Sequence, residues 1–275
     1  MSKGSEGSSN AVARIVSGAV YFVVCVGCLY LGRYATAAII SVMATMCVFE
    51  FQRMGRMAGR MPNELIVYVT TPLYPLAALI VGRHGLLMLT YALIFACAAW
   101  FVMTPRATIG DVALTAFGPL YCGLTLSCLV MLRMSAPGHG GALLCFGIMG
   151  SIWLNDSFAY LIGSRFGRHK LAPRISPNKS VEGFWGGIAA CVLTWVLMVL
   201  LHAPGITWPK ALIVGPLVGV ASVMGDLFES RIKRGVGVKD SGNVMPGHGG
   251  MLDRSDALIF GSMVAYMGLH IWGAL

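Results

Sequence analysis

The chain contains 275 residues, of which 57% are hydrophobic and only 11% are charged, and its mean hydropathy is +0.76. Soluble domains are usually about 25% charged, so this composition excludes an ordinary soluble protein and predicts a polytopic membrane protein. The formal net charge is +9. In a membrane protein such an excess marks cytoplasmic loops, anionic lipid or a phosphate-rich substrate, so we expect the lipid bilayer, and no nucleic acid, among its partners.

Nine apolar segments follow one another along the chain, each close to the roughly 20 residues that a helix needs to cross a bilayer. Segments of this length predict helices instead of barrel strands, because backbone polar groups in lipid must be satisfied internally. We therefore predict an all-α polytopic membrane protein, with a flexible cytoplasmic tail over 1–10 and one membrane-embedded domain over 11–275. The predicted spans are 12–31, 34–51, 65–82, 85–103, 111–132, 142–163, 185–203, 210–228 and 257–274.

Lys and Arg residues are distributed unevenly between the two sides of these spans. With a cytoplasmic N-terminus, and therefore a C-terminus outside, sixteen of the twenty fall on the cytoplasmic side. The four exceptions are Arg33, Arg83, Arg133 and Lys210. Cytoplasmic loops are enriched in these residue types. The bias predicts a multi-pass protein of the cell membrane whose loop 164–184 and polar stretch 225–256 face the cytoplasm.

A short glycine-rich sequence occurs twice, as PGHGGAL at 137–143 and as PGHGGML at 246–252. The predicted topology places the first copy outside, with no acidic residue near it, so His139 is expected to lie in a plain turn. The second copy lies inside, beside Lys239 and Asp240. Nothing else around the two copies matches, so the repeat does not indicate a duplicated domain.

Asp156 lies in the sixth predicted span, within the sequence WLNDSFAY. It is about 10 Å from the cytoplasmic end of that span, at roughly 1.5 Å per helical residue. A charged side chain at such a depth costs on the order of 2–3 kcal/mol, so it normally faces a polar cavity, which Asn155, Ser157 and Tyr160 are placed to line. The alternative is a protonated or hydrogen-bonded aspartate that serves only helix packing.

The loop between the sixth and seventh spans is basic and is interrupted by prolines. Ser176 followed by Pro177 predicts a helix N-cap and a first helical position. This arrangement would direct free N–H groups, Lys179 and Ser180 toward a phosphate. The other basic residues of the loop serve equally well as topology signals or lipid-headgroup contacts. Glu182 fits a metal ligand, a salt-bridge partner or a helix cap.

The stretch 225–256 is polar and glycine-rich, between two long apolar runs, and holds five of the eleven carboxylates. Carboxylates bind hard cations such as Mg²⁺ through oxygen. Asp226 ends the eighth predicted span, where the helix dipole disfavours a carboxylate, so it requires a cation. Asp253 and Asp256 are i, i+3 neighbours before the ninth span. We expect Asp226 and Asp253 to be joint Mg²⁺ ligands, and a helix N-cap is the alternative for Asp253.

The same stretch carries basic residues that suit phosphate binding. Lys233, Arg234 and Lys239 lie near Asp240 and the second glycine-rich turn. They do not belong to a Walker loop, because the sequence G-x-x-x-x-G-K-[ST] is absent. Phosphoryl transfer depends more on positioning and charge neutralisation than on acid–base chemistry. His248 is therefore expected to donate to a phosphate or to support the turn, with a general base as the remaining reading.

Together these residues form an ordered pattern that resembles the signature of the phosphatidate cytidylyltransferases (CDP-diacylglycerol synthases). Its longest part runs over 230–256 as S-x-I-K-R-x₄-K-D-x-G-x₂-M-P-x-H-G-G-M-x-D-R-x-D. Shorter matches are D-S-x-A-Y at 156–160, I-S-P-x-K-S-x-E-G at 175–183 and G-D-L-x-E-S at 225–230. The resemblance covers about half of the chain in motif and all of it in topology. Phe158 stands where a glycine is common, and it is expected to narrow the cavity beside Asp156.

The resemblance implies a membrane-embedded enzyme that makes CDP-diacylglycerol and pyrophosphate from CTP and phosphatidic acid, with Mg²⁺ neutralising charge on the phosphates. It also implies a homodimer and a two-metal site, with K⁺ as a candidate for the second ion, and Asp226 and Asp253 as metal ligands. The residues it assigns to the reaction centre are Asp226, Asp253, Lys239, Asp240, Asp256 and Asp156. Those it assigns to substrate binding are Ser176, Lys179, Ser180, Lys233, Arg234, His248, Gly249, Gly250 and Arg254.

Two other functions compete with this one. Another membrane enzyme of nucleotide or lipid phosphates, such as a CDP-alcohol or polyprenyl-phosphate sugar-1-phosphate transferase, is the nearer alternative. The CDP-alcohol class would show D-G-x-x-A-R with later aspartates, and no such run occurs. A cation-coupled transporter would use Asp156 and Asp226 as ion ligands at kinked helices, but transport sites gather near the membrane midplane, away from the polar stretch.

Overall fold

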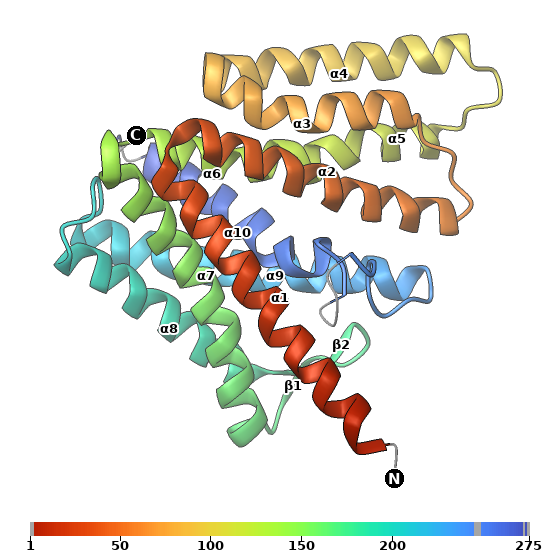
Figure 1. Cartoon of the computed structure of the whole chain (residues 1–275). Helices are drawn as coiled ribbons and strands as arrows, with labels where there is room; N and C mark the ends of the chain where they lie inside the picture. Colours follow the sequence, from red (N-terminus) through yellow and green to blue (C-terminus); the bar gives the residue numbers. More distant parts are fainter. Residues whose placement is uncertain (1–2, 245–248, 272, 274–275) are drawn as a thin grey trace.

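A computed structural model describes residues 3–244, 249–271 and 273, and within them the chain is a helix bundle with one small hairpin (Figure 1). The helices are α1 Lys3–Leu31, α2 Arg33–Met57, α3 Glu64–Val81, α4 Arg83–Met103, α5 Ile109–Gly118, the π-helical segment η1 Pro119–Leu124, α6 Thr125–Met134, α7 Gly138–Phe166, α8 Val181–Leu200, α9 Trp208–Gly235 and α10 Leu252–Ile271. The antiparallel hairpin consists of β1 Lys170–Ala172 and β2 Ser176–Ser180.

The helical segments confirm an all-α polytopic chain, with the hairpin as a small exception. Seven segments of the described chain are long and apolar enough to cross a membrane, and α5, η1 and α6 together form one of them, Ile109–Met134. The apolar part of α1, Val16–Leu31, is shorter. The predicted number of nine spans, and the side on which each terminus lies, stay predictions.

The C-terminal helices α9 and α10 occupy the middle of the bundle. In Figure 1, α3 and α4 lie on one side of them, α7 and α8 on the other, and α1 crosses in front of α9. α10 packs against α9, α7, α6 and α2. An aromatic cluster joins η1 to both central helices, because the ring of Phe228 lies 5.2 Å from that of Tyr121 and 5.6 Å from that of Phe260. The polar stretch between α9 and α10 is therefore held against the core.

Several predicted helix ends are wrong, and buried polar residues explain the most important one. α9 continues to Gly235, beyond the predicted end at 228, because Glu229 and Lys233 lie on its buried face. Asp226 is therefore inside the helix, and the argument from a C-terminal dipole does not apply to it. α10 likewise starts at Leu252, earlier than the predicted span.

The other differences at helix ends lie in the first and seventh helices. α1 begins at Lys3, so residues 3–10 are part of this helix, and the flexibility predicted for residues 1–10 stays a prediction. No proline interrupts this part, and an established helix extends more easily than a new one starts. α7 begins at Gly138, so most of the first glycine-rich copy is helical, and the ring of His139 lies 5.6 Å from that of Tyr30. Residues 246–248 of the second copy lie outside the described residues.

Prolines have different effects in different helices. Pro72 and Pro75 lie inside α3, and Pro216 lies inside α9. Pro119 begins η1, where the helix widens to the π form for six residues. A proline removes one backbone donor and crowds the preceding turn, and a π segment is one of the ways in which a helix absorbs this. Of these prolines, Pro119 is therefore the one that coincides with a change of helix type.

Gly225 allows α9 and α10 to approach closely. A Cβ atom at this position would lie 2.3 Å from the Asp256 carbonyl oxygen. We expect Gly225→Ala to force the two helices apart and to reduce the free energy of unfolding by about 1–3 kcal/mol, the usual cost of overpacking. Thermal unfolding in detergent measures this. Gly235→Ala is the matched control, because a Cβ there meets nothing within 4 Å, and equal melting temperatures for the two variants would contradict the close approach.

Candidate active site

A pocket of about 590 Å³ opens between α7, the hairpin, α8 and α9. Four of the residues predicted for the site, Asp156, Lys179, Ser180 and Asp226, line it together with Tyr160. They come from separate segments, and the fold brings them to one place. The predicted polar cavity beside Asp156 is therefore present.

Lys179 lies between two carboxylates of this pocket. Its ammonium nitrogen is 2.6 Å from Asp226 Oδ2, and the Ser230 hydroxyl donates to Asp226 Oδ1 over 3.2 Å. The charge of Lys179 also attracts the Asp156 carboxylate, which the charge of Asp226 repels. One lysine therefore offsets part of the negative charge of two aspartates, from α7 and α9.

The hairpin that carries Lys179 differs from the predicted helix start. Ser176 and Pro177 lie in β2, and the N-cap of α8 is Ser180, whose hydroxyl accepts the Gly183 N–H over 3.1 Å. Proline is tolerated at strand edges, and the short strand keeps Ser176 away from any helix N-terminus. The prediction for Ser176 as an N-cap is wrong. Lys179 and Ser180 nevertheless reach the pocket.

Glu182 fastens the hairpin to the start of α8. Its carboxylate accepts the backbone N–H groups of Arg168 and His169 over 3.1 and 3.2 Å, and His169 Nδ1 lies 2.7 Å from Glu182 Oε1. These contacts are hydrogen bonds, and the one with His169 Nδ1 is a salt bridge when the imidazole is protonated, so they match the salt-bridge role most closely of the three. Glu182 thereby ties the chain on the two sides of the hairpin together.

Two residues predicted to line the cavity beside Asp156, Asn155 and Ser157, do not line the pocket, although the Asn155 side chain interacts with the Asp156 carboxyl group. Asn155 is fully buried between helices, and Ser157 is exposed and donates to the Trp153 carbonyl over 2.8 Å. Phe158 is 41% exposed and does not line the pocket. The helix period turns its side chain away from Asp156, so the expectation that Phe158 narrows the cavity is wrong.

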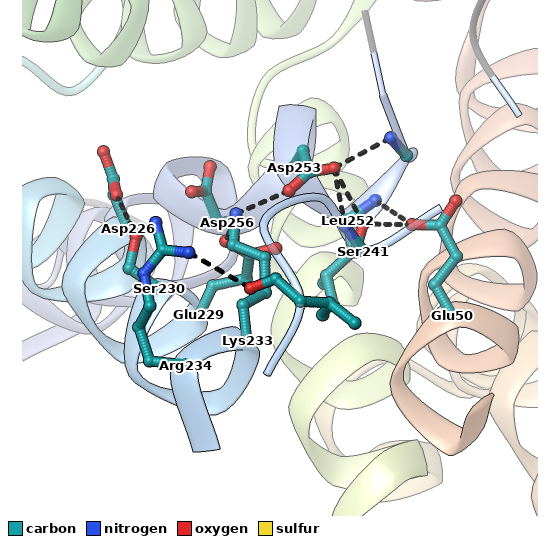
Figure 2. A network of polar contacts seen from close by, with 12 residues as sticks. Glu50, Asp226, Glu229, Ser230, Lys233, Arg234, Ser241, Leu252, Asp253 and Asp256 are labelled. Atoms are coloured by element: carbon teal, nitrogen blue, oxygen red, sulfur yellow. Dashed lines mark hydrogen bonds and ion pairs between the residues drawn. The ribbon is translucent and has the colours of Figure 1, made fainter. Parts of the chain in front are cut away.

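A second polar cluster lies at the far end of α9 (Figure 2). Lys233 is paired with Glu229, one turn earlier, and its nitrogen also lies 2.6 Å from Asp253 Oδ1. Glu229 is fully buried, and the Lys233 side chain is only 11% exposed. Because a buried charge is costly without a partner, Lys233 compensates both carboxylates at once.

Asp253 is held from its other oxygen by the loop before α10. Its Oδ2 accepts the Ser241 N–H over 3.0 Å, the Ser241 hydroxyl over 3.0 Å and the Gly250 N–H over 2.8 Å. These N–H groups belong to residues before α10, and Asp253 is the second residue of the helix, so the contacts differ from those of an N-cap, whose side chain accepts N–H groups further along the helix. They do not test the Mg²⁺-ligand prediction.

Asp256 lies between the pocket and the cluster. It is 9% exposed, and its Oδ1 accepts the Ala257 N–H over 2.7 Å. The charges of Asp226 and Asp156 repel it from the pocket side, and it repels Glu229 on the other side. The four carboxyl groups of Asp156, Asp226, Asp256 and Glu229 therefore form one continuous acidic cluster that joins the two groups of residues.

The loop before α10 carries the remaining predicted residues. Lys239 and Asp240 are exposed and lie outside the pocket, and Arg234 donates to the Val238 carbonyl over 3.2 Å. Arg254 is exposed, and its charge attracts Asp156. His248 lies outside the described residues.

Gly249 and Gly250 contact protein carboxylates. Gly249 has a φ of +84°, and a Cβ there would lie 2.9 Å from Asp253 Oδ2. A Cβ at Gly250 would lie 2.2 Å from Glu50 Oε2. The predicted role of these glycines in substrate binding stays a prediction, but their close approach to Asp253 and Glu50 is an observed reason for the absence of a side chain.

Glu50 is the residue of this region that sequence reasoning missed. It belongs to α2, is 1% exposed, and accepts the Met251 and Leu252 N–H groups, each over 2.9 Å. The signal that could have found it is an ionisable residue inside the second predicted span, which is a candidate functional residue by default. Its position one residue before the predicted end of that span made it resemble an ordinary interfacial residue.

The two predicted Mg²⁺ ligands each have a lysine as counterion, Lys179 for Asp226 and Lys233 for Asp253. Carboxylate oxygens are the donors that Mg²⁺ prefers, so the donor chemistry fits this ion. Among the described residues no three His, Cys, Asp or Glu side chains are grouped closely enough to hold a metal. The metal prediction is therefore supported by donor type and charge and is not tested by geometry.

Comparison with known proteins decides the family. The model of the cytidylyltransferase family matches residues 12–272. The chain belongs to the cytidylyltransferase family.

Named relatives of this cytidylyltransferase cover different shares of its length. The phosphatidate cytidylyltransferase of Synechocystis sp. is 31% identical over 92% of this chain and 94% of its own. That of Bacillus subtilis is 30% identical over 90% of this chain and 93% of its own. That of Thermotoga maritima is 44% identical over 49% of this chain and 50% of its own. Membership of this family is compatible with the observed pocket, in which a lysine and carboxylates lie together beside apolar helices.

Proposed function

We propose that this cytidylyltransferase makes CDP-diacylglycerol and pyrophosphate from CTP and phosphatidic acid. The observation that carries the proposal is the pocket beside α7, α8 and α9, where Lys179 contacts Asp226 next to Asp156. Relatives that match more than 90% of their own length are named phosphatidate cytidylyltransferase. A site for two phosphate substrates needs cations, and a lipid substrate needs apolar helices beside them.

The reaction transfers a cytidylyl group. A phosphate oxygen of phosphatidic acid forms a bond to the α-phosphorus of CTP, and the bond from that phosphorus to the departing pyrophosphate breaks. The chain contributes mainly by binding and orienting, as is usual in phosphoryl transfer. Lys179, on the hairpin, lines the pocket and is placed to contact a phosphate. Lys233 does not line the pocket, and we propose it as a second phosphate contact because it is the cation paired with Asp253.

Charge balance supports a metal ion in this mechanism. Each ionised carboxylate in the acidic cluster of Asp156, Asp226, Asp256 and Glu229 would repel two phosphate substrates. Asp226 and Asp253 would hold Mg²⁺, and the ion would supply charge neutralisation for the reacting phosphates. We further propose K⁺ as the second ion and a homodimer as the assembly. The distribution of Lys and Arg supports a pocket that faces the cytoplasm, where CTP is found.

Purified protein in lipid nanodiscs, given labelled CTP and phosphatidic acid, tests the function. We expect CDP-diacylglycerol and pyrophosphate in equal amounts, and only when Mg²⁺ is present. Diacylglycerol in place of phosphatidic acid is the control, because it lacks the attacking phosphate and should give no product. Absence of CDP-diacylglycerol with the complete mixture would refute the proposal.

A further inference from the structure

Glu50 connects the N-terminal half of the chain to the segment that carries Asp253. Figure 2 shows it pointing from α2 toward Ser241 and Leu252. Its Oε1 accepts the Met251 N–H over 2.9 Å, and its Oε2 accepts the Leu252 N–H over 2.9 Å and the Ser241 hydroxyl over 2.7 Å. These contacts fix the backbone at the exact point where α10 begins.

The fit around Glu50 leaves no room for additional atoms. A Cβ atom at Gly242 would lie 2.4 Å from Glu50 Oε1, and one at Gly250 would lie 2.2 Å from Glu50 Oε2. Two glycines therefore let the loop wrap closely around one carboxylate. Such a close fit fixes the position of the loop relative to α2 and also stabilises the protein.

Ser241 carries the influence of Glu50 to Asp253. Its hydroxyl lies 2.7 Å from Glu50 Oε2 and 3.0 Å from Asp253 Oδ2. Asp253 in turn pairs with Lys233. The path from Glu50 through Ser241 and Asp253 to Lys233 is thus continuous, and it leads from α2 to the cluster on α9.

We infer that Glu50 is a positioning residue of the cytidylyl-transfer site, which orients Asp253 and Lys233 by holding Ser241 and the start of α10. This inference rests on the proposed function. Glu50 does not line the pocket, so it acts through its neighbours and not on the substrate. Positioning by surrounding hydrogen bonds is what keeps reacting groups aligned, and small displacements reduce rates strongly.

Glu50→Gln is the variant of choice, because it preserves size and changes only the hydrogen bonding. All three partners of Glu50 donate to its carboxylate. The glutamine NH₂ group must face either the Met251 N–H or the Leu252 N–H, and both are donors. At least one hydrogen bond is lost, and the start of α10 shifts.

Asp111→Asn is the matched control for stability alone. Asp111 is 5% exposed at the start of α5 and accepts the Met61 N–H over 2.7 Å, the Thr108 N–H over 2.8 Å and the Thr108 hydroxyl over 2.7 Å. It therefore resembles Glu50 in burial and in the number and kind of its donors. It belongs to a different helix start, and it lies outside the pocket.

We expect both variants to melt at a lower temperature than the unmodified protein. Only Glu50→Gln should reduce kcat/KM for CTP, by about 10- to 100-fold, and raise the Mg²⁺ concentration for half-maximal activity. KM for phosphatidic acid should stay within about twofold in both variants, because neither Glu50 nor Asp111 lines the pocket and the expected loss in Glu50→Gln arises from misaligned Asp253 and Lys233. An unchanged kcat/KM for CTP in Glu50→Gln, or an equal decrease in both variants, would overturn the inference.

Amide hydrogen exchange over residues 249–252 provides a readout that does not need turnover. We expect faster exchange there in Glu50→Gln and no change in Asp111→Asn. If the unmodified protein makes no CDP-diacylglycerol, the proposed function fails, and exchange still decides whether Glu50 holds this segment. Exchange equal to that of the unmodified protein in Glu50→Gln would overturn the anchoring itself.

Discussion

Asp226→Asn is expected to reduce turnover by about 10³-fold, the loss seen when a charge-stabilising group is removed from a reaction centre. Asp226 lies in the pocket, and its carboxylate is 2.6 Å from the Lys179 nitrogen. Asparagine keeps the shape and an oxygen for the Ser230 hydroxyl, but it loses the charge that would hold Mg²⁺. Turnover of labelled CTP across a Mg²⁺ titration measures the effect.

The free energy of unfolding should change little in Asp226→Asn. A loss of turnover in this variant can therefore be distinguished from a loss caused by unfolding. The Lys179 and Asp226 side chains are 23% and 30% exposed, and ion pairs with such access to solvent contribute about 0–1 kcal/mol. Glu64→Gln is the control, because it removes a carboxylate from a partly exposed pair with Arg56 and should leave turnover unchanged. Asp226→Asn that retains more than about a tenth of the activity would remove Asp226 from the metal site.

The helices were predictable because their signal is local. Apolar length alone predicts a helix at each of the segments that the structure contains. Their ends were not predictable where polar residues are buried. The predicted span stops at 228, before Glu229 and Lys233, yet each of these residues compensates the other inside the protein, and α9 continues past both. Hydropathy cannot distinguish an exposed charge from a paired one.

The site was predictable only in part. Residues within recognisable motifs were found, whereas a residue whose contacts lie far away along the chain was missed. Asp156, Lys179 and Asp226 lie in recognisable motifs, and the structure brings them into one pocket. Glu50 meets Ser241, 191 residues further along the chain, and no local pattern encodes such a contact. The Ser176 prediction failed for another reason. A serine before a proline suits a helix start, but here the same residues pair as an edge strand.

Lys233→Met is expected to lower the free energy of unfolding by about 3–5 kcal/mol, the cost of leaving a buried ion without its partner. Methionine is unbranched and of similar length, so it creates little cavity. It leaves Glu229 and Asp253 with no cation between them, and Glu229 is fully buried. Thermal and chemical unfolding in detergent measure the loss. Arg234→Met is the control, because Arg234 is exposed and surface changes usually stay within about 0.5 kcal/mol.

Adding Glu229→Gln to Lys233→Met distinguishes the two roles of the lysine. The second substitution removes the more deeply buried of the two charges, so we expect it to restore a large part of the lost stability. Turnover should stay low, because Asp253 still lacks the nitrogen that lies 2.6 Å from its Oδ1 and the site lacks a phosphate-binding cation. If turnover returned together with stability, Lys233 would serve only to neutralise Glu229, and its proposed contact with substrate phosphate would be wrong. Recovery of stability without recovery of turnover would show that the Lys233 ammonium group has a role in the reaction in addition to its role in folding.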